Sequence, residues 1–187
     1  MWQDDVLVAI NKPAGLLVHR SPIDRHETQF AVQQLRDQLG CWVYPVHRLD
    51  KPTSGLLLFA LEPEVAATLA RQFEQRTVQK RYWAVVRGHA PSAIDIDHSL
   101  RDEVDAKGQA IDHVEHRDAQ TSLRCLTSWV LPMPVDRYPE ARYSLVELQP
   151  RTGRYRQLRR HLKHIAHPII GDTRYGKGTH NRFFRQQ

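Results

Sequence analysis

The chain has 187 residues, of which 41% are hydrophobic, and a formal net charge of +6. Its apolar content is sufficient for a folded core, which excludes a disordered chain. The longest apolar run, residues 56–61, is far too short to cross a bilayer, and the N-terminus lacks the features of a signal peptide. We therefore expect a cytoplasmic protein. Its two cysteines, Cys41 and Cys125, are expected to be free thiols in a reducing compartment.

The first part of the chain predicts two short strands followed by a helix. The apolar stretches 6–10 and 16–18 are typical of buried strands, and the Pro and Gly in 11–15 break them apart. Helical spacing of apolar residues then predicts a helix over 27–39, with Gly40 as its C-terminal stop.

A polar turn at residues 47–55 leads directly into the apolar run 56–59, which predicts a buried strand. Asp50 lies in this turn between Arg48 and Lys51, and nearby positive charge favours an ionised carboxylate that can act as a nucleophile or base. The alternative is that Asp50 only opens an Asp-Lys-Pro turn by bonding its own backbone. Composition alone favours that alternative.

The next elements are a helix over 64–75 and a strand over 78–88. Alternation along the strand puts Tyr82 on one face and Trp83 on the other. Both faces are apolar, so we expect the strand to be central in its sheet. Taken alone, Tyr82 fits a core tyrosine with a satisfied hydroxyl.

Residues 98–118 are polar and of mixed charge, which predicts a solvent-facing loop or hairpin. The acids in this segment lack the ligand spacing of a divalent metal site. Two strands, 121–130 and 142–149, are expected to follow, joined by a Pro-rich turn.

The segment 152–166 predicts a helix with Thr152 as its N-cap. Its buried stripe is expected to contain Tyr155, Leu158, Leu162 and Ile165, and Arg159 borders that stripe. A buried guanidinium requires an acidic partner, and Asp50 is among the candidates.

Positive charge is concentrated at the C-terminal end. Residues 151–187 contain ten Lys and Arg but one acid, Asp172, which gives +9, whereas residues 1–150 sum to −3. Such a block is typical of a protein that binds a phosphate-rich partner. The alternatives are a solvated basic helix face and a helix at a membrane surface.

Three histidines, His161, His164 and His167, invite a zinc hypothesis. Their spacing puts the first two near one face of a helix, but the third drifts away and no thiolate or carboxylate completes a set. We therefore expect no metal site here.

Four segments together resemble the RluA family of pseudouridine synthases. His-Arg-Leu-Asp-Lys-Pro-Thr-Ser-Gly at 47–55 is similar to the catalytic motif, and Lys-x-Tyr at 80–82 to the segment that supplies an active-site tyrosine. The segments 152–159 and 166–176 are similar to Thr-Gly-Arg-x-x-Gln-Leu-Arg and Gly-His-Pro-Ile-x-Gly-Asp-x-x-Tyr-Gly. This chain departs from these patterns at Tyr155, Arg156 and Ala166.

The resemblance implies an α+β fold: a mixed, mostly antiparallel bent sheet with flanking helices and a central cleft. It implies one catalytic domain over 1–187, with two sub-lobes around one sheet and no separate N-terminal RNA-binding domain. Relatives usually continue with a further helix and strand, so the C-terminal end is expected to be shortened relative to the family.

The resemblance also implies the roles of individual residues. Asp50 is the catalytic carboxylate, Arg159 pairs with it, and Tyr82 stacks on the flipped base and relays a proton. Asp172 is expected to be structural and to bridge to the basic helix. The residues expected to contact RNA are His47, Arg48, Arg154, Arg156, Arg160 and Lys163.

The implied reaction isomerises a uridine and needs no cofactor and no metal. The C-terminal segment most resembles family members that act on tRNA, which implies the T-stem uridine at position 65. We also expect a monomer without an obligatory protein partner or membrane contact. The alternatives are a sister enzyme acting on ribosomal RNA, a non-catalytic basic RNA-binding module and a metal-dependent nuclease.

Overall fold

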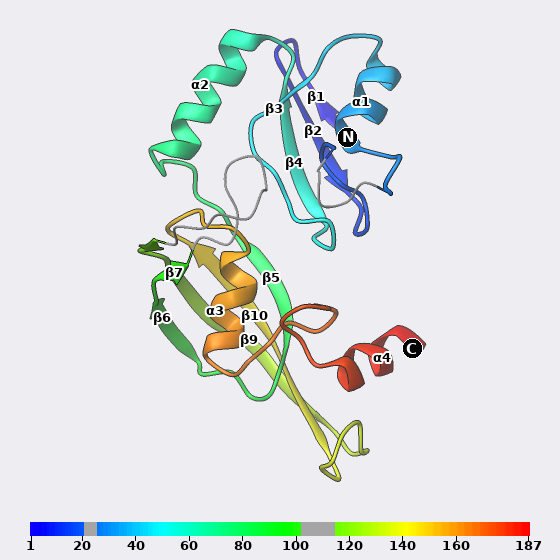
Figure 1. Ribbon diagram of the computed structural model, residues 1–187, viewed down its shortest axis with the longest axis vertical. Coiled ribbons are helices and arrows are strands. Elements are labelled where there is room, and N and C mark those ends of the chain that lie inside the picture. Colours follow the sequence, from blue (N-terminus) through cyan, green and yellow to red (C-terminus); the bar gives the residue numbers. More distant parts are fainter. Residues whose placement is uncertain (21–25, 102–114) are drawn as a thin grey trace. The chain divides into compact units, whose positions relative to one another are not determined.

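The computed structural model describes residues 1–20, 26–101 and 115–187, which form two compact units (Figure 1). Unit 1 contains the described residues up to Val78, and unit 2 contains those from Gln79 onward. The predicted α+β class is confirmed, because helices accompany sheets in which every pairing between the described strands is antiparallel. Among these residues, no helix is both long and apolar enough to cross a bilayer.

Unit 1 is built on a four-stranded sheet in the order β1-β2-β4-β3. Its strands are β1 (Trp2–Gln3), β2 (Leu7–Lys12), β4 (Gly55–Ala60) and β3 (Tyr44–Pro45). The apolar run after the Asp50 turn forms β4 as predicted, and Leu57 and Phe59 are completely buried in it. Gly55 begins this strand with φ of +123°, which residues with a side chain rarely adopt.

Two helices accompany this sheet, α1 (Ala31–Leu39) and α2 (Pro63–Glu74). The predicted end of α1 is confirmed, since Gly40 adopts a left-handed conformation and its N–H bonds the carbonyl of Arg36. The helix begins at Ala31 rather than at the predicted residue 27. The prediction for α2 is correct to within a residue at each end.

Unit 2 contains a second four-stranded sheet, in the order β5-β10-β9-β6, and a two-stranded sheet of β7 and β8. The strands are β5 (Tyr82–Arg87), β6 (Ala93–Asp97), β7 (Leu100–Arg101), β8 (His116–Arg117), β9 (Gln120–Leu131) and β10 (Ala141–Pro150). Most of the predicted polar insertion at 98–118 lies outside the described residues. That the two lobes share one sheet stays a prediction.

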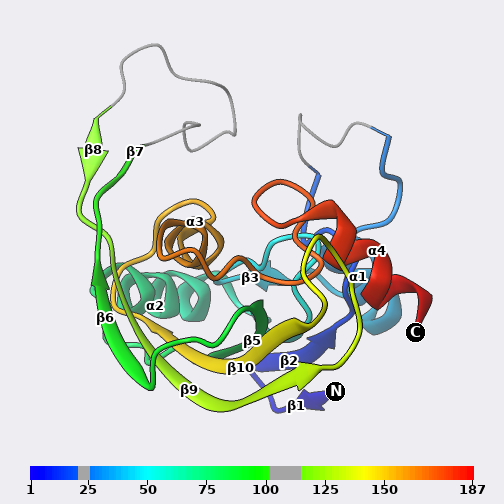
Figure 2. The same cartoon turned by 90° about the horizontal axis from the view of Figure 1, so that it is seen from below.

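Helix α3 (Gln157–His164) covers one face of this second sheet, beside β9 and β10 (Figure 2). The completely buried Leu162 packs there with Val86, Leu123, Val146 and Leu148. Leu158 and Ile165 pack against the same cluster, which confirms most of the predicted apolar stripe.

Two predictions about unit 2 are wrong. Strand β5 is not central: it lies at the edge of the four-stranded sheet, beside β10, and Trp83 on its outer face is 69% exposed. Thr152 does not cap α3: its hydroxyl accepts a hydrogen bond from the backbone N–H of Gln120 and donates one to Oε1 of Gln157. The residue before the helix is Arg156, in a left-handed conformation.

A short helix, α4 (Gly178–Gln186), follows the last basic loop. His180 hydrogen-bonds the hydroxyl of the buried Tyr143 of β10, at 2.8 Å, and Phe184 packs edge-on against the Tyr143 ring. These contacts attach α4 to the second sheet.

We predict that Leu162→Ala lowers the free energy of unfolding by about 2–5 kcal/mol, because it leaves a cavity between α3 and the sheet. The matched control is Leu56→Ala, whose side chain is 69% exposed and which should change stability by less than about 0.5 kcal/mol. Denaturant unfolding of both variants measures the difference. Equal losses would contradict the assignment of this core.

Candidate active site

Asp50 lies in a tight turn that joins residue 47 to strand β4. The backbone N–H of Thr53 bonds the carbonyl of Asp50 at 2.9 Å, which closes the turn. The ammonium of Lys51 donates to the carboxylate of Glu27 at 2.6 Å, and the carbonyl of Lys51 accepts the N–H of Gly15 at 2.8 Å. The turn is thus attached to chain segments that are distant from it in sequence.

Lys12, at the end of β2, supports the turn that contains Asp50. The sequence did not predict this supporting role. The Lys12 side chain is completely buried, and Nζ donates to the carbonyls of Pro13 and Leu16, both at 2.8 Å, and of Lys51, at 3.3 Å. Burial lowers the pKa of the Lys12 ammonium, and the neighbouring Asp50 carboxylate acts in the opposite direction. A buried cation therefore lies beside Asp50.

His47 and Arg48 begin the same turn. Nε2 of His47 accepts a hydrogen bond from the N–H of Leu58 at 3.1 Å, and the ring stacks on Phe73 of α2. His47 therefore fixes the turn to β4 and α2. Arg48 is exposed. The pKa of His19 is lowered mainly by burial of its ring and, to a smaller extent, by the charge of the Arg48 guanidinium. RNA contact by either residue stays a prediction.

In unit 2, Arg159 of α3 binds the carboxylate of Asp172 through two parallel hydrogen bonds. Its Nε lies 2.7 Å from Oδ2 and its Nη2 lies 2.9 Å from Oδ1. The two side chains are only 13% and 3% exposed, respectively. The expectation that Asp172 bridges to the basic helix agrees with this geometry, and the pairing of Arg159 with Asp50 stays a prediction.

The Asp172 carboxyl is stabilised in its ionised form. Burial alone would raise its pKa, but hydrogen bonds from Arg159 and from the backbone N–H groups of Tyr175 and Arg174 hold the pKa below its usual value. The same carboxylate therefore neutralises Arg159 and organises the loop that follows.

Tyr82 begins strand β5 opposite Leu148 of β10. The ring is half-buried and packs against the cluster that contains Leu162. It therefore lies on the sheet face that α3 covers, while Trp83 faces the other way.

Of the predicted RNA-contacting residues of unit 2, Arg154 and Arg156 precede α3, whereas Arg160 and Lys163 lie within it. Nε of Arg154 donates to the carbonyl of Asp118, and the Arg156 guanidinium stacks 4.6 Å from the centre of the Tyr155 ring. Arg160 is partly exposed and Lys163 is exposed. Arg156 has a φ of +53°, an uncommon conformation for a residue with a Cβ.

The two histidines of α3, His161 and His164, both contact His98. His161 is completely buried, and its ring nitrogens bond the Thr121 hydroxyl and the carbonyl of His98. His164 stacks on the His98 ring with the centroids 3.7 Å apart. In the parts of the chain that the structure describes, no group of three His, Cys, Asp or Glu is arranged to hold a metal.

Comparison with known proteins defines the class of enzyme. The model of the family described as RNA pseudouridylate synthase matches residues 6–164, which include the Asp50 turn, β5 and α3. The chain therefore belongs to the RNA pseudouridylate synthase family and is an isomerase that makes pseudouridine in RNA.

Individual relatives are similar over nearly the whole chain. The protein named tRNA pseudouridine synthase C of Pasteurella multocida is 54% identical over 184 residues, which span 97% of this chain and 76% of that protein. Its namesake in Vibrio cholerae is 48% identical, over 100% of this chain and 77% of that protein. That of Haemophilus influenzae is 52% identical over 97% and 77%.

Solved structures of the same family share the fold. Human RNA Pseudouridylate Synthase Domain Containing 1 superimposes with a TM-score of 0.74 at 27% identity, covering 97% of this chain and 71% of that one. Human RNA Pseudouridylate Synthase Domain Containing 4 gives 0.69 at 30% identity, over 95% and 68%. The predicted fold is thereby confirmed.

We predict that Lys12→Met lowers the free energy of unfolding by about 1–3 kcal/mol, because buried carbonyls lose their donor. It should also slow isomerisation by protein that is still folded, since the Asp50 turn loses its support. Lys51→Met is the matched control: it removes the surface ion pair with Glu27, which is worth about 0–1 kcal/mol. Denaturant unfolding and turnover on RNA measure both effects. Equal stability losses in the two variants would contradict the role assigned to Lys12.

We also predict an acid-dependent loss of stability that depends on His161. Burial lowers its pKa below the ordinary 6.5, so the unfolded chain binds the proton first as the pH falls. The free energy of unfolding should then decrease as the pH falls through and below about 6.5, the ordinary value for histidine. The decrease should be smaller in His161→Leu, but unchanged in the exposed control His89→Leu. An unaltered decrease in His161→Leu would contradict the prediction.

Proposed function

We propose that this chain converts a uridine of tRNA to pseudouridine, at position 65 in the T stem, with Asp50 as the attacking carboxylate. The observation that carries the proposal is the Asp50 turn itself. The Asp50 carboxylate lies close enough to the buried Lys12 to act on the pKa of its ammonium. Nearly the whole chain, 97–100%, aligns with relatives named tRNA pseudouridine synthase C. The target uridine is taken from the resemblance to the family members that act on tRNA.

The RNA must first expose the target. A paired uridine hides its reacting atoms, and an A-form stem is read mainly through its shape and its phosphates. The nucleotide therefore has to be flipped out, at a cost of a few kcal/mol. The proposed compensation comes from cationic side chains that bind phosphates: Arg48, Arg154, Arg156, Arg160 and Lys163, with His47, the neighbour of Arg48 in the sequence, as a further contact.

The proposed chemistry rearranges bonds within one nucleotide. Asp50 attacks either the base or the sugar, or takes a sugar proton, and the bond between N1 of uracil and C1′ of ribose breaks. The uracil rotates and C5 forms the new bond to C1′, while the bond to Asp50 breaks, or Asp50 returns the sugar proton that it took. The proton of C5 is then released and N1 gains one. Atoms and electrons therefore balance without a redox partner, a cofactor or a metal.

Two further residues complete the proposal. Tyr82 offers a flat ring on which the flipped uracil stacks, and its hydroxyl can take the proton from C5. Arg159 is the proposed cationic partner of Asp50.

Asp50→Asn tests the proposal, because it keeps the shape of the side chain and removes the nucleophile. With a tRNA transcript that contains 5-tritiated uridine, the wild type should release tritium in the presence of EDTA. Asp50→Asn should be slower by more than about a thousandfold. The control Asp37→Asn, at an exposed aspartate of the same unit, should match the wild type.

Affinity separates chemistry from binding in this test. Asp50→Asn should bind the transcript as tightly as the wild type. Tritium release by Asp50→Asn at the wild-type rate would refute the role of Asp50. Release from a ribosomal RNA transcript but not from tRNA would replace the proposed substrate with the ribosomal alternative.

A further inference from the structure

Gln157, the first residue of α3, is buried, and the chemistry proposed above does not use its side chain. Its Oε1 accepts the hydroxyl of Thr152 at 2.7 Å and the backbone N–H of Arg154 at 3.0 Å. Its Nε2 donates to the carbonyl of Gln120 at 2.9 Å and to the hydroxyl of Thr121 at 3.0 Å. One amide therefore connects the segment before α3 to the start of β9.

Two backbone partners fix the orientation of this amide. A backbone N–H only donates, so the atom that faces Arg154 is Oε1, and a carbonyl only accepts, so the atom that faces Gln120 is Nε2. A flipped amide would place two donors together at one contact and two acceptors at the other. Gln157 therefore holds a single orientation, and the segment bonded to it is held as well.

The segment that this amide holds, residues 152–156, carries two of the arginines expected to contact RNA. Arg154 is bound at its backbone by Gln157, and its Nε donates to the carbonyl of Asp118 at 3.0 Å. The Thr152 hydroxyl also accepts the backbone N–H of Gln120 at 2.9 Å. Contacts within the protein therefore set the path of this segment before any ligand binds.

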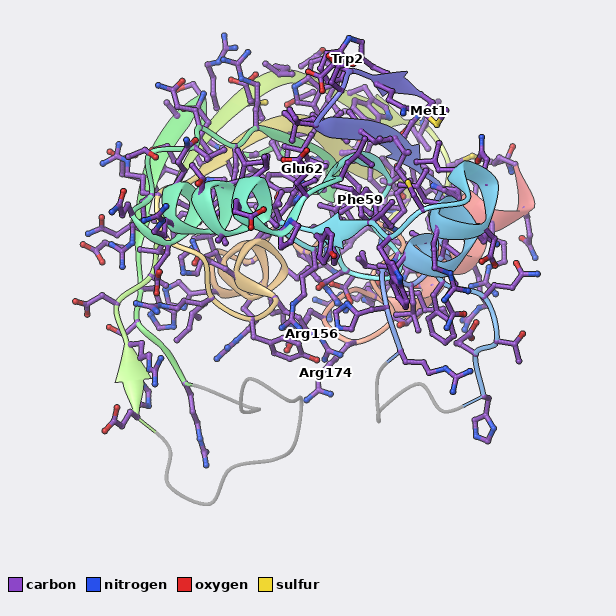
Figure 3. All side chains as sticks on the ribbon, turned by 90° about the horizontal axis from the view of Figure 1, so that it is seen from above. Met1, Trp2, Phe59, Glu62, Arg156 and Arg174 are labelled. Carbon is purple, nitrogen blue, oxygen red and sulfur yellow. The ribbon has the colours of Figure 1, made fainter. Side chains whose placement is uncertain are left out.

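Arg156, the second of these arginines, has an unfavourable backbone conformation. Its φ of +53° and ψ of 30° lie in the left-handed region, which the Cβ disfavours. Such conformations persist where the surrounding structure imposes them, and they are concentrated at functional sites. Figure 3 shows the Arg156 side chain on the side of α3 that faces away from the second sheet. The imposed turn therefore directs this cation away from the core cluster around Leu162.

We propose that Gln157 is a positioning residue for RNA binding, whose buried amide holds segment 152–156 so that Arg154 and Arg156 meet backbone phosphates of the substrate. Charge indicates this ligand, because residues 151–187 carry ten Lys and Arg and a single acid, which Arg159 binds. Ordering the segment in advance removes that entropic cost from binding. The proposal rests on the proposed function and adds a residue that acts through its neighbours.

Two buried threonines offer a matched pair of variants. The hydroxyls of Thr152 and Thr121 both bond the Gln157 amide, and the two residues are 3% and 1% exposed. Thr152 belongs to the arginine segment, whereas Thr121 belongs to β9 and also bonds the ring of His161. Thr152→Val and Thr121→Val therefore remove the same group from opposite ends of one network, and both should lower thermal stability.

The salt dependence of RNA binding separates these variants. Each phosphate contact contributes about 0.9 to the slope of log K against log[salt] for a duplex. With the unmodified tRNA transcript, Thr152→Val should lower this slope by about 0.9 to 1.8, because one or both arginine contacts are lost. It should also raise KM by about tenfold with little change in kcat. Thr121→Val should keep the wild-type slope and KM, and so should Thr152→Ser, which retains the hydroxyl.

A coupling experiment shows whether the arginines carry the effect. The double variant Arg154→Gln and Arg156→Gln should lower the slope by about 1.8, and adding Thr152→Val to it should lower the slope no further. Gln157→Met keeps the length of the side chain without the amide, so the folded variant should bind RNA as Thr152→Val does. A wild-type slope in Thr152→Val, an equal loss in Thr121→Val, or a further loss in the triple variant would overturn the positioning role.

The failure of this inference is distinguishable from failure of the proposed function. The salt slope is measured by binding alone, whereas the proposed function is measured by tritium release. A wild type that releases no tritium, with slopes that differ between Thr152→Val and Thr121→Val as stated, would refute the proposed function and support the role of Gln157. Normal release with equal slopes in the two variants would do the reverse.

Discussion

Helix α3 presents the guanidinium of Arg159 to the protein interior, where the carboxylate of Asp172 binds it through two hydrogen bonds. A guanidinium that is 13% exposed would be strongly destabilising without a carboxylate of matching geometry. Asp172 supplies that carboxylate and uses its remaining capacity on the backbone of the following loop. One ion pair therefore fixes the orientation of Arg159, the path of residues 172–176 and, through Asn181, the start of α4.

Unit 1 also contains a buried cation, the ammonium of Lys12. Lys12 is completely buried and donates to three carbonyls, one of which belongs to the turn that contains Asp50. Removing the charge would leave buried acceptors without donors, so the turn depends on it. In both units, a buried charge that is satisfied by hydrogen bonds holds a residue to which we assign catalysis.

Features of the fold that depend on residues close together in the chain, such as strands and helix ends, can be predicted from the sequence. The apolar run after Asp50 predicts β4, and the left-handed glycine at the end of α1 is evident from its position. The burial of Lys12 is not evident, because one of its acceptors lies 39 residues away. Thr152 matches the N-cap preference, yet the buried side chain of Gln157 takes its hydroxyl. That Arg159 requires an acidic partner can be predicted from its place beside the apolar stripe. The position of the Tyr175 ring next to Arg159 cannot, because it depends on the path of an irregular loop that has no sequence periodicity.

The most direct test of the central claim is to locate the product in the RNA. An unmodified tRNA transcript is incubated with the folded chain, and pseudouridine is mapped along it by selective chemical labelling and primer extension. The account predicts one pseudouridine, at position 65 of the T stem, which the Asp50→Asn variant fails to produce. A folded wild type that binds the transcript and leaves every uridine unchanged would contradict the account.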